Sequence, residues 1–229
     1  MTRVTELIPS PESLIPGEIS PGAFHLPHYL SLQRQRTVLD RCRLLLDGAV
    51  PAYVPIVRGG GRMHVRMLCL GRHWNARTYQ YESTRADFDG LPAPPLPPEF
   101  RTLAREIACR AGMSLEPDLC ILNYYDTDGR MGLHQDKDEG PASIAAGIPV
   151  VSVSIGDTAR FLFGGLKRRD PVEVFDLASG DAFVFGGPAR LRYHGVSRIT
   201  PGTAPSWLDL SGRLNLTFRQ SDEGCRASS

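Results

Sequence analysis

The sequence lacks the features that mark secreted and membrane proteins. It has no C-x-x-C pair, and its odd, scattered set of cysteines argues against a disulfide framework: Cys42, Cys69, Cys109, Cys120 and Cys225. The N-terminal segment contains no apolar run of signal-peptide length. No stretch approaches the ~18 apolar residues that a membrane helix needs. We therefore expect a soluble protein of the cytoplasm, with no membrane partner.

A strong net charge is also missing. At +1, the overall balance neither demands nor excludes a nucleic-acid partner. The segment from Arg58 to Tyr81 is rich in arginine, contains no Asp or Glu, and has three aromatic residues, Trp74, Tyr79 and Tyr81. Guanidinium groups bind phosphates and exposed rings stack on unpaired bases, so the segment suits a nucleic-acid surface. A solvated positive edge with its rings packed in the core has the same composition, and the segment alone does not separate the two.

Periodicity predicts the secondary structure. Apolar residues recur at helical spacing between Ser31 and Gly48 and between Pro98 and Gly112, which predicts two helices. Residues 1 to about 28 show little periodicity and are expected to wrap the surface or to stay partly mobile. Beyond Gly112 the period is two, and the candidate strands are Cys120–Tyr125, Val150–Ile155, Phe161–Phe163, Val172–Phe175, Ala182–Phe185, Arg190–His194 and Leu214–Arg219. Short strands without intervening helices predict a sandwich or a jelly roll, so the fold class is mainly β with flanking helices (α+β).

A His-x-Asp pair near the middle of the chain is a candidate metal site. If Leu133–Asp136 is extended, His134 and Asp136 point to the same face, because strand side chains repeat every two residues. They make two thirds of a 2-His-1-carboxylate triad, the usual site for non-haem Fe(II), and His194 is a candidate for the third ligand. A His-x-Asp pair also arises by chance, and a single buried histidine is more often a core residue.

The last candidate strand has one polar face. Arg213, Asn215, Thr217 and Arg219 alternate with Leu214, Leu216 and Phe218. Two arginines that face inward need an anionic partner, and a dicarboxylic acid would satisfy both. Asn123 and Tyr125, also two residues apart, are candidates for its remaining hydrogen bonds. Beside an iron site such an acid would be 2-oxoglutarate. The alternative is that Arg219 pairs with an acid of the protein and Arg213 is exposed.

Six runs of residues resemble those of the AlkB family, which consists of Fe(II)- and 2-oxoglutarate-dependent dioxygenases that repair alkylated bases. The resemblance extends from about Arg62 to Gln220, with the same order and similar spacing. The runs are Asn123-Tyr124-Tyr125, Leu133-His134-Gln135-Asp136-Lys137-Asp138-Glu139, Val151-Ser152-Val153-Ser154, Phe163-Gly164-Gly165-Leu166-Lys167-Arg168, Tyr193-His194-Gly195 and Arg213-Leu214-Asn215-Leu216-Thr217-Phe218-Arg219.

The resemblance implies a role for each matching residue. It implies that His134, Asp136 and His194 bind iron and are the catalytic centre. It assigns the 2-oxoglutarate site to Asn123, Tyr125, Arg213, Asn215 and Arg219. The aligned substrate residues are Trp74, Tyr79, Tyr81, Asp138 and Arg168, of which the three aromatic ones belong to the family's nucleotide-recognition lid. The resemblance therefore favours base binding for the Arg58 to Tyr81 segment.

The fold implied by the resemblance is a double-stranded β-helix (jelly roll) with an N-terminal lid. The expected division is an N-terminal extension and helix (1–50), the lid and its supporting helix (51–112), the dioxygenase core (113–220) and a tail (221–229), in one compact unit. Residues 1 to about 50 match poorly. The loop Gly140–Gly147 looks longer than its counterpart in bacterial relatives, which leaves the substrate range open.

The activity implied is oxidative demethylation of bases such as 1-methyladenine and 3-methylcytosine. It uses Fe(II), O2 and 2-oxoglutarate and releases succinate, CO2 and formaldehyde. Single-stranded DNA is the expected partner, with RNA as a further candidate, and we expect a monomer. One rival hypothesis is a 2-oxoglutarate-dependent oxygenase that acts on a small molecule or a protein side chain. Another is a non-catalytic nucleic-acid binder.

Overall fold

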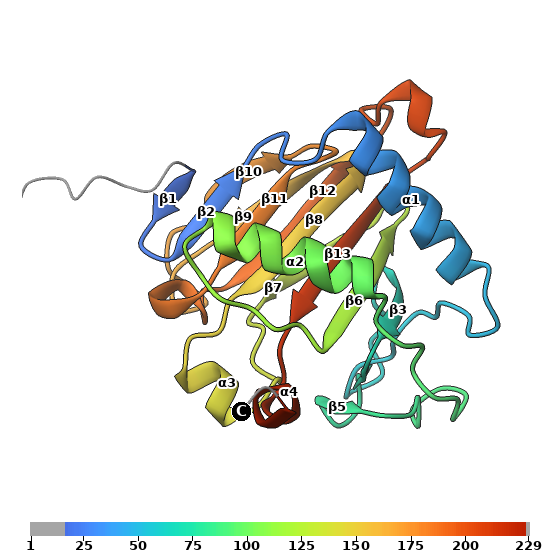
Figure 1. Ribbon diagram of the computed structural model, residues 1–229, viewed down its shortest axis with the longest axis vertical. Coiled ribbons are helices and arrows are strands. Elements are labelled where there is room, and N and C mark those ends of the chain that lie inside the picture. Colours follow the sequence, from blue (N-terminus) through green and yellow to red (C-terminus); the bar gives the residue numbers. More distant parts are fainter. Residues whose placement is uncertain (1–16, 228–229) are drawn as a thin grey trace, which may run out of the picture.

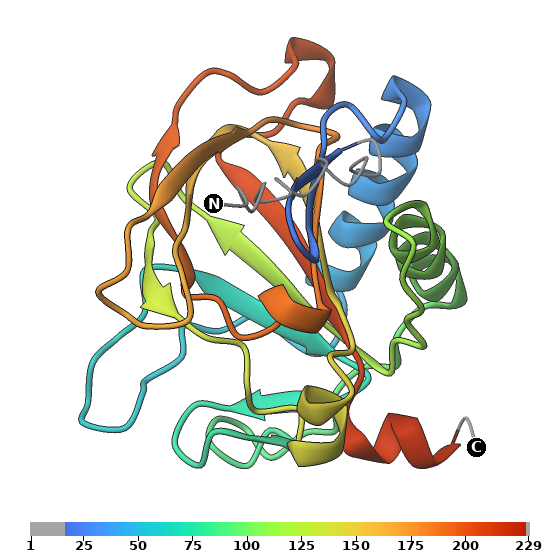
Figure 2. The ribbon, with the colours of Figure 1, turned by 90° about the vertical axis from the view of Figure 1, so that its left-hand side faces the viewer.

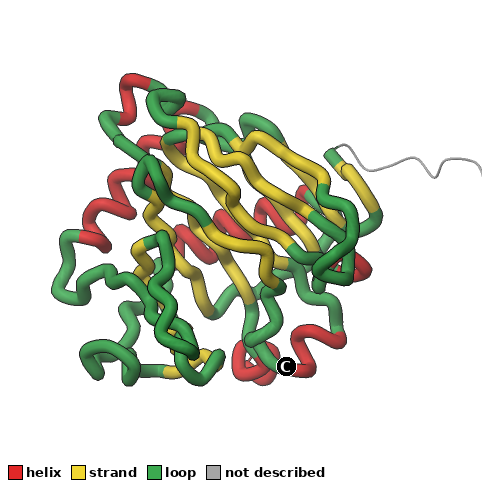
Figure 3. Tube along the Cα trace, turned by 180° about the vertical axis from the view of Figure 1, so that it is seen from behind, coloured by secondary structure: helices red, strands yellow, loops and turns green. Residues whose placement is uncertain are grey.

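The structure is a computed structural model that describes residues 17–227, and its strands form a jelly roll of two facing sheets. The larger sheet has the order β1-β2-β11-β8-β13-β6-β3, and the smaller sheet has the order β10-β9-β12-β7. Figure 2 shows the two sheets as separate layers, with helices outside the larger one. Figure 3 shows the smaller sheet from the opposite side of the molecule to Figure 1.

The strands of the larger sheet are β1 (Glu18–Ser20), β2 (Ala23–Leu26), β3 (Arg66–Leu70), β6 (Leu119–Tyr125), β8 (Val150–Gly156), β11 (Ala182–Phe185) and β13 (Arg213–Arg219). Those of the smaller sheet are β7 (Met131–His134), β9 (Thr158–Phe163), β10 (Glu173–Leu177) and β12 (His194–Thr200). A separate hairpin consists of β4 (His73–Asn75) and β5 (Gln80–Glu82). The helices are α1 (Leu32–Leu46), α2 (Pro98–Arg110), α3 (Pro141–Ala145), α4 (Asp222–Ala227), and the 3-10 turns η1 (Gly187–Ala189) and η2 (Ser206–Leu208).

Both predicted long helices are confirmed, and they lie across the outer face of the larger sheet (Figure 1). Helix α1 begins after Ser31, whose hydroxyl accepts a hydrogen bond from the Arg34 N–H, and α2 begins with Pro98 at its first position. Their buried stripes pack on β8, β11 and β13, and each fully buried large apolar side chain contributes about 1.5–3 kcal/mol. The helices therefore cover one face of the sheet whose other face carries polar side chains.

The space between the sheets is part core and part cavity. Phenylalanines from both sheets pack together there, with ring centroids 4.8 Å apart for Phe161 and Phe183 and 5.1 Å apart for Phe163 and Phe183. Beside them lies a cavity of about 630 Å³, lined by residues of β6, β7, β12 and β13. The predicted metal-binding and 2-oxoglutarate-binding residues line this cavity.

Two predicted extended segments are wrong in detail. Arg190–His194 is not a strand: it begins with a turn that directly follows η1, and β12 begins only at His194. The Arg190 side chain points inward to the carbonyl of Ile148, 2.7 Å away, which holds the backbone in a turn. Strand β7 likewise ends at His134, so Asp136 lies in the loop that follows, not in the strand.

The N-terminal residues contribute more than the sequence suggested. Strand β2 pairs with β11, and β1 pairs with β2, so residues 18–26 extend the larger sheet. Residues 1–16 lie outside the described residues. The loop Gly140–Gly147 contains the short helix α3. The division into segments at residues 50, 112 and 220 stays a prediction. No helix among residues 17–227 is long and apolar enough to cross a membrane.

Candidate active site

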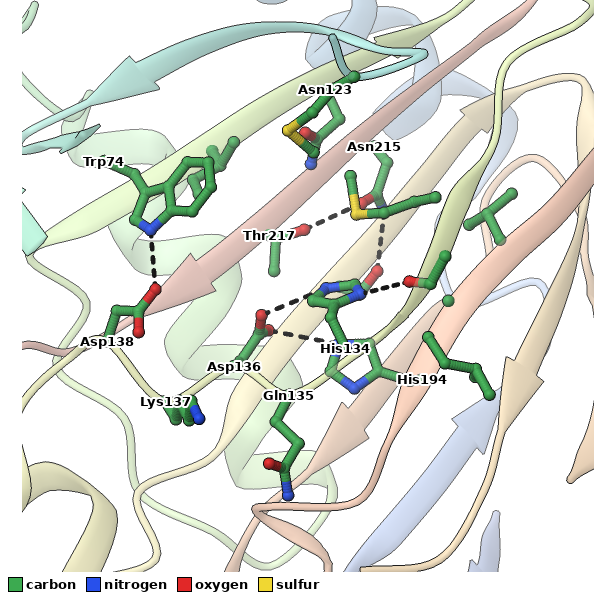
Figure 4. A pocket seen from close by; sticks show the side chains of 18 of the residues that line it. Trp74, Asn123, His134, Gln135, Asp136, Lys137, Asp138, His194, Asn215 and Thr217 are labelled. Carbon is green, nitrogen blue, oxygen red and sulfur yellow. Dashed lines mark hydrogen bonds and ion pairs between the residues drawn. The ribbon is translucent and has the colours of Figure 1, made fainter. Parts of the chain in front are cut away.

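Three ligand-type side chains converge at the edge of the cavity. The donor atoms of His134, Asp136 and His194 all lie within 4.8 Å of one another. The Nε2 atom of His134 is 3.6 Å from Asp136 Oδ1, and that of His194 is 3.5 Å from Asp136 Oδ2. The two histidines face each other because they are register partners in the β7–β12 pair. Figure 4 shows both rings turned toward the carboxylate.

The backbone fixes the orientation of both imidazoles. The Nδ1 atom of His134 lies 2.9 Å from the Gly132 carbonyl oxygen, and that of His194 lies 3.0 Å from the Arg192 carbonyl oxygen. A carbonyl only accepts, so each Nδ1 carries the proton and each Nε2 lone pair faces the shared point. Burial and the neighbouring His134 lower the pKa of His194, which keeps its ring neutral and able to bind a metal.

The carboxylate of Asp136 is ionised and shared with an arginine. Burial raises the pKa of Asp136, but Arg219 and then His194 oppose this and hold the pKa well below its usual range. The Nη2 atom of Arg219 lies 2.6 Å from Asp136 Oδ2, and its Nε atom lies 3.1 Å from Glu139 Oε1. For Arg219, the alternative of pairing with acids of the protein is therefore correct.

Arg213 is different, because it is buried and short of partners. Its exposed fraction is 1%. Its Nη2 donates to Ser154 Oγ at 3.0 Å, but no described residue accepts from Nε or Nη1. Burial lowers the pKa of Arg213 to about 10. A buried guanidinium with two unused nitrogens at a cavity wall is the site for an anion.

The neighbouring strands surround this arginine with polar groups. Tyr125 is the register partner of Arg213, and Asn123 is that of Asn215, so β6 and β13 present the predicted set on one face. The Asn123 Oδ1 atom has no hydrogen-bond partner among residues 17–227. Asn215 instead donates to Ser152 Oγ at 2.7 Å and accepts from Thr217 at 2.9 Å. On this wall, Arg213 and Asn123 therefore keep polar atoms without a hydrogen-bond partner among the described residues, whereas the amide of Asn215 is already hydrogen-bonded.

These residues fit Fe(II) and 2-oxoglutarate. Two neutral imidazoles and one carboxylate on one side of a point are the donor set of non-haem iron sites, with the opposite side open. The guanidinium of Arg213, which has no acidic partner among the described residues, lies on the wall of the same cavity. The carboxylate of a bound dicarboxylic acid that points away from the metal would neutralise it.

All five predicted substrate residues line the cavity, and one of them also contacts the metal-site arginine. The indole N–H of Trp74 donates to Asp138 Oδ2 at 2.8 Å (Figure 4), and the Trp74 and Tyr79 rings meet edge to face at 5.7 Å. Arg168 also lines the cavity and donates to the Leu133 carbonyl at 2.7 Å. The hydroxyl of Tyr81 instead accepts from Arg219 at 2.8 Å, so Tyr81 ties the β4–β5 hairpin to the metal-site arginine.

Two site residues received no role from the sequence. Glu139 lies within a motif run, but nothing in the run shows that its carboxylate is buried against Arg219. Arg190 lies in a segment predicted to be a strand, and its guanidinium binds Glu139 at 2.8 Å. Their ion-pair partners come from segments far away in the sequence, so residue spacing could not predict a role for either residue.

The chain is similar to a family of oxygenases and to several of its known members. The model of the 2OG-Fe(II) oxygenase superfamily matches residues 22–219, and so begins well before Arg62. A DNA N(6)-methyladenine demethylase, ALKBH1C of Arabidopsis thaliana, is 43% identical over 88% of this chain, which spans about half (49%) of that relative's length. An alpha-ketoglutarate-dependent dioxygenase AlkB homolog of Caulobacter vibrioides is 38% identical over 95% of this chain and 94% of its own.

The solved structure of OsALKBH1 superposes with a TM-score of 0.83 at 39% identity, over 89% of this chain and 98% of that one. The family model, which matches residues 22–219, spans all the strands that carry the candidate site. The chain therefore belongs to the 2OG-Fe(II) oxygenase superfamily and, within it, to the AlkB family.

Proposed function

We propose that this protein is an Fe(II)- and 2-oxoglutarate-dependent dioxygenase that removes methyl groups from ring nitrogens of DNA bases, with RNA as a further substrate. The observation that carries the proposal is the unpaired guanidinium of Arg213 in the same cavity as the His134, Asp136 and His194 cluster. Family membership supports the cofactors, and the names of the relatives support a nucleic-acid substrate.

In this proposal, His134, Asp136 and His194 hold Fe(II), and the two Nδ1 hydrogen bonds keep both imidazoles aimed at it. Bound together, Fe(II) and 2-oxoglutarate would supply an oxidation that converts O2 and 2-oxoglutarate to succinate and CO2 while the methyl group is hydroxylated. The N–C bond of the hydroxymethyl group then breaks, which releases formaldehyde and the unmethylated base. Arg213 neutralises the far carboxylate of 2-oxoglutarate, and the amide N–H of Asn123 and the hydroxyl of Tyr125 donate its remaining hydrogen bonds. Asn215 and Arg219 complete the wall of the 2-oxoglutarate pocket. Arg219 acts through its ion pair with Asp136.

The mouth of the cavity is suited to a single base turned out of its strand. The indole of Trp74 provides a stacking surface, and Asp138 retains one carboxylate oxygen beyond the one that Trp74 uses. A negative charge at this position favours the positively charged rings of 1-methyladenine and 3-methylcytosine. Tyr79 and Arg168 lie where the adjoining backbone would pass, and the β4–β5 hairpin would act as the lid. Single strands are preferred because no base pair has to be broken.

The test uses single- and double-stranded DNA and RNA oligonucleotides that carry one 1-methyladenine, 3-methylcytosine or N6-methyladenine. With Fe(II) and 2-oxoglutarate we expect mass spectrometry to show loss of one methylene mass from the two cationic bases first, with formaldehyde released. N6-methyladenine is included because of the names of the Arabidopsis relatives; it is neutral and gains nothing from the charge of Asp138. The His134→Ala variant is the control.

Succinate release without any change in oligonucleotide mass would favour the rival oxygenase that acts on a small molecule or a protein side chain. Binding of the oligonucleotide with no turnover of either the oligonucleotide or 2-oxoglutarate would favour the non-catalytic nucleic-acid binder. A monomeric state and a cytoplasmic location stay predictions.

A further inference from the structure

Four buried charges alternate in sign beside the candidate metal site: Asp136, Arg219, Glu139 and Arg190, which we call the buried ion quartet. Each has an exposed fraction of 8% or less. Arg219 lies 2.6 Å from Asp136 Oδ2 and 3.1 Å from Glu139 Oε1, and Arg190 donates to Glu139 Oε2 at 2.8 Å. The Nε–H of Arg219 donates to Asp136, and Glu139 Oε1 accepts no hydrogen bond from the described residues, so the Arg219–Glu139 contact is electrostatic. Their formal charges cancel, and only Asp136 belongs to the candidate ligand set.

The quartet joins three segments that are distant in the sequence. Asp136 and Glu139 lie in the loop after β7, Arg219 ends β13, and Arg190 lies in the turn before His194. Arg190 also donates to the backbone carbonyls of Asp136 and Ile148. Arg190 therefore fixes the loop that carries Glu139 against the turn that leads to the second histidine, while Glu139 is the only member that contacts both arginines.

Arg219 and a bound metal ion compete for the same carboxylate. The Nη2 and Nε atoms of Arg219 lie 2.6 and 3.0 Å from Asp136 Oδ2, the oxygen that also faces His194. A guanidinium that is shared between two carboxylates stabilises each of them less than one that is concentrated on a single partner. Glu139 is the second partner, and its charge also adds to the negative potential around the cation site.

We propose that Glu139 is a positioning residue that draws Arg219 away from Asp136 and so sets the metal affinity of the site. Arg190 contacts the other oxygen of Glu139 and contributes chiefly to stability. This inference rests on the metal site of the proposed function. It assigns different effects to two residues that are both buried and ion-paired. Loss of Glu139 weakens metal binding, because Arg219 then concentrates on Asp136, whereas loss of Arg190 leaves the Glu139–Arg219 contact intact and chiefly lowers stability.

The test is a titration of the metal-free protein with Co(II), followed by visible absorption, together with thermal unfolding of each variant without metal. For Glu139→Gln, which keeps the shape of the side chain and removes its charge, we expect a loss of roughly 10- to 100-fold in Co(II) affinity. For Arg190→Gln we expect a lower melting temperature and an unchanged Co(II) affinity. Glu116→Gln is the matched control, because Glu116 pairs with Arg105 at the surface.

A Co(II) affinity in Glu139→Gln equal to that of the unchanged protein would overturn the inference. Equal losses in Glu139→Gln and Arg190→Gln would do the same, since a merely structural quartet predicts that affinity follows stability. If Glu139→Gln does not fold, the double variant Glu139→Gln with Arg190→Gln removes an opposite pair of charges and restores folding, and weak Co(II) binding is again expected. Failure of the unchanged protein to bind Co(II) would refute the proposed metal site itself.

Discussion

Replacing Arg213 by methionine separates stability from co-substrate binding more sharply than any other single change at the site. The guanidinium is 1% exposed and shares one hydrogen bond with Ser154. Methionine has a similar length, fills the same volume and carries no charge. We expect Arg213→Met to fold at least as stably as the unchanged protein when both lack 2-oxoglutarate, and to bind 2-oxoglutarate far more weakly.

The magnitude follows from the pKa of Arg213. Burial lowers this pKa from its ordinary value to about 10, so the folded protein binds the proton less tightly than the unfolded chain does. The charged form therefore opposes folding throughout the range below pH 10, by about 3 kcal/mol, and the penalty shrinks as the pH rises above that value. A carboxylate that binds at Nε and Nη1 removes this penalty. Its loss corresponds to roughly a 100-fold weaker affinity for 2-oxoglutarate.

The assay is calorimetric titration of 2-oxoglutarate into protein loaded with Mn(II), which avoids turnover, together with thermal unfolding in the absence of 2-oxoglutarate. Arg110→Met is the matched control, since Arg110 is exposed on α2. The reasoning is refuted if Arg213→Met binds 2-oxoglutarate as tightly as the control does. A large drop in melting temperature without 2-oxoglutarate would refute the charge argument separately, because it would show that the isolated cation contributes to stability.

Three further changes test other parts of the site and the fold. His134→Ala should abolish both Co(II) absorption and demethylation while thermal unfolding changes little; retained activity would exclude His134 as a ligand. Trp74→Ala should raise the KM for a methylated oligonucleotide by about tenfold, and Trp74→Phe by much less, because stacking on an aromatic ring contributes about 1–3 kcal/mol per base. Burial raises the pKa of Asp181, but the His25 hydrogen bond and two backbone amides more than offset this and lower it below 3.8. Asp181→Asn should therefore cost about 2 kcal/mol of unfolding free energy at pH 7, measured by urea unfolding, and the cost should vanish as the pH falls through the lowered pKa of Asp181. A cost that is independent of pH would contradict this.

The parts of the fold that the sequence predicted correctly are those with regular periodicity. The alternation in β13 predicted which side chains face the cavity, and the register with β6 places Arg213 beside Tyr125 as a two-residue repeat requires. The two long helices were equally readable, because each buries one apolar stripe against a sheet. Asp136 reached the site although β7 ends before it, so the short spacing from His134 was enough without the predicted strand.

Segments without periodicity could not be predicted in this way. The hairpin of β1 and β2 is short, and its hydrogen bonds depend on β11, more than 150 residues later in the chain. The Arg190 segment alternates like a strand, but its backbone forms a turn because its guanidinium finds Glu139 and two carbonyls in another loop. In both cases the structure depends on residues that are distant in the sequence, and local propensity contains no information about such contacts.

Contacts with distant residues give the two inward-facing arginines of β13 different roles. In the sequence Arg213 and Arg219 are equivalent: both occupy the polar face, and a dicarboxylate that bridges them is a consistent prediction. In the structure the charge of Arg219 is already offset by Asp136 and Glu139, while Arg213 has no acidic partner among the described residues. Only Arg213 therefore gains a full ion pair when 2-oxoglutarate binds. Arg219, in contrast, acts on the candidate metal ligand Asp136, so one strand presents two like charges that serve different components of the same reaction.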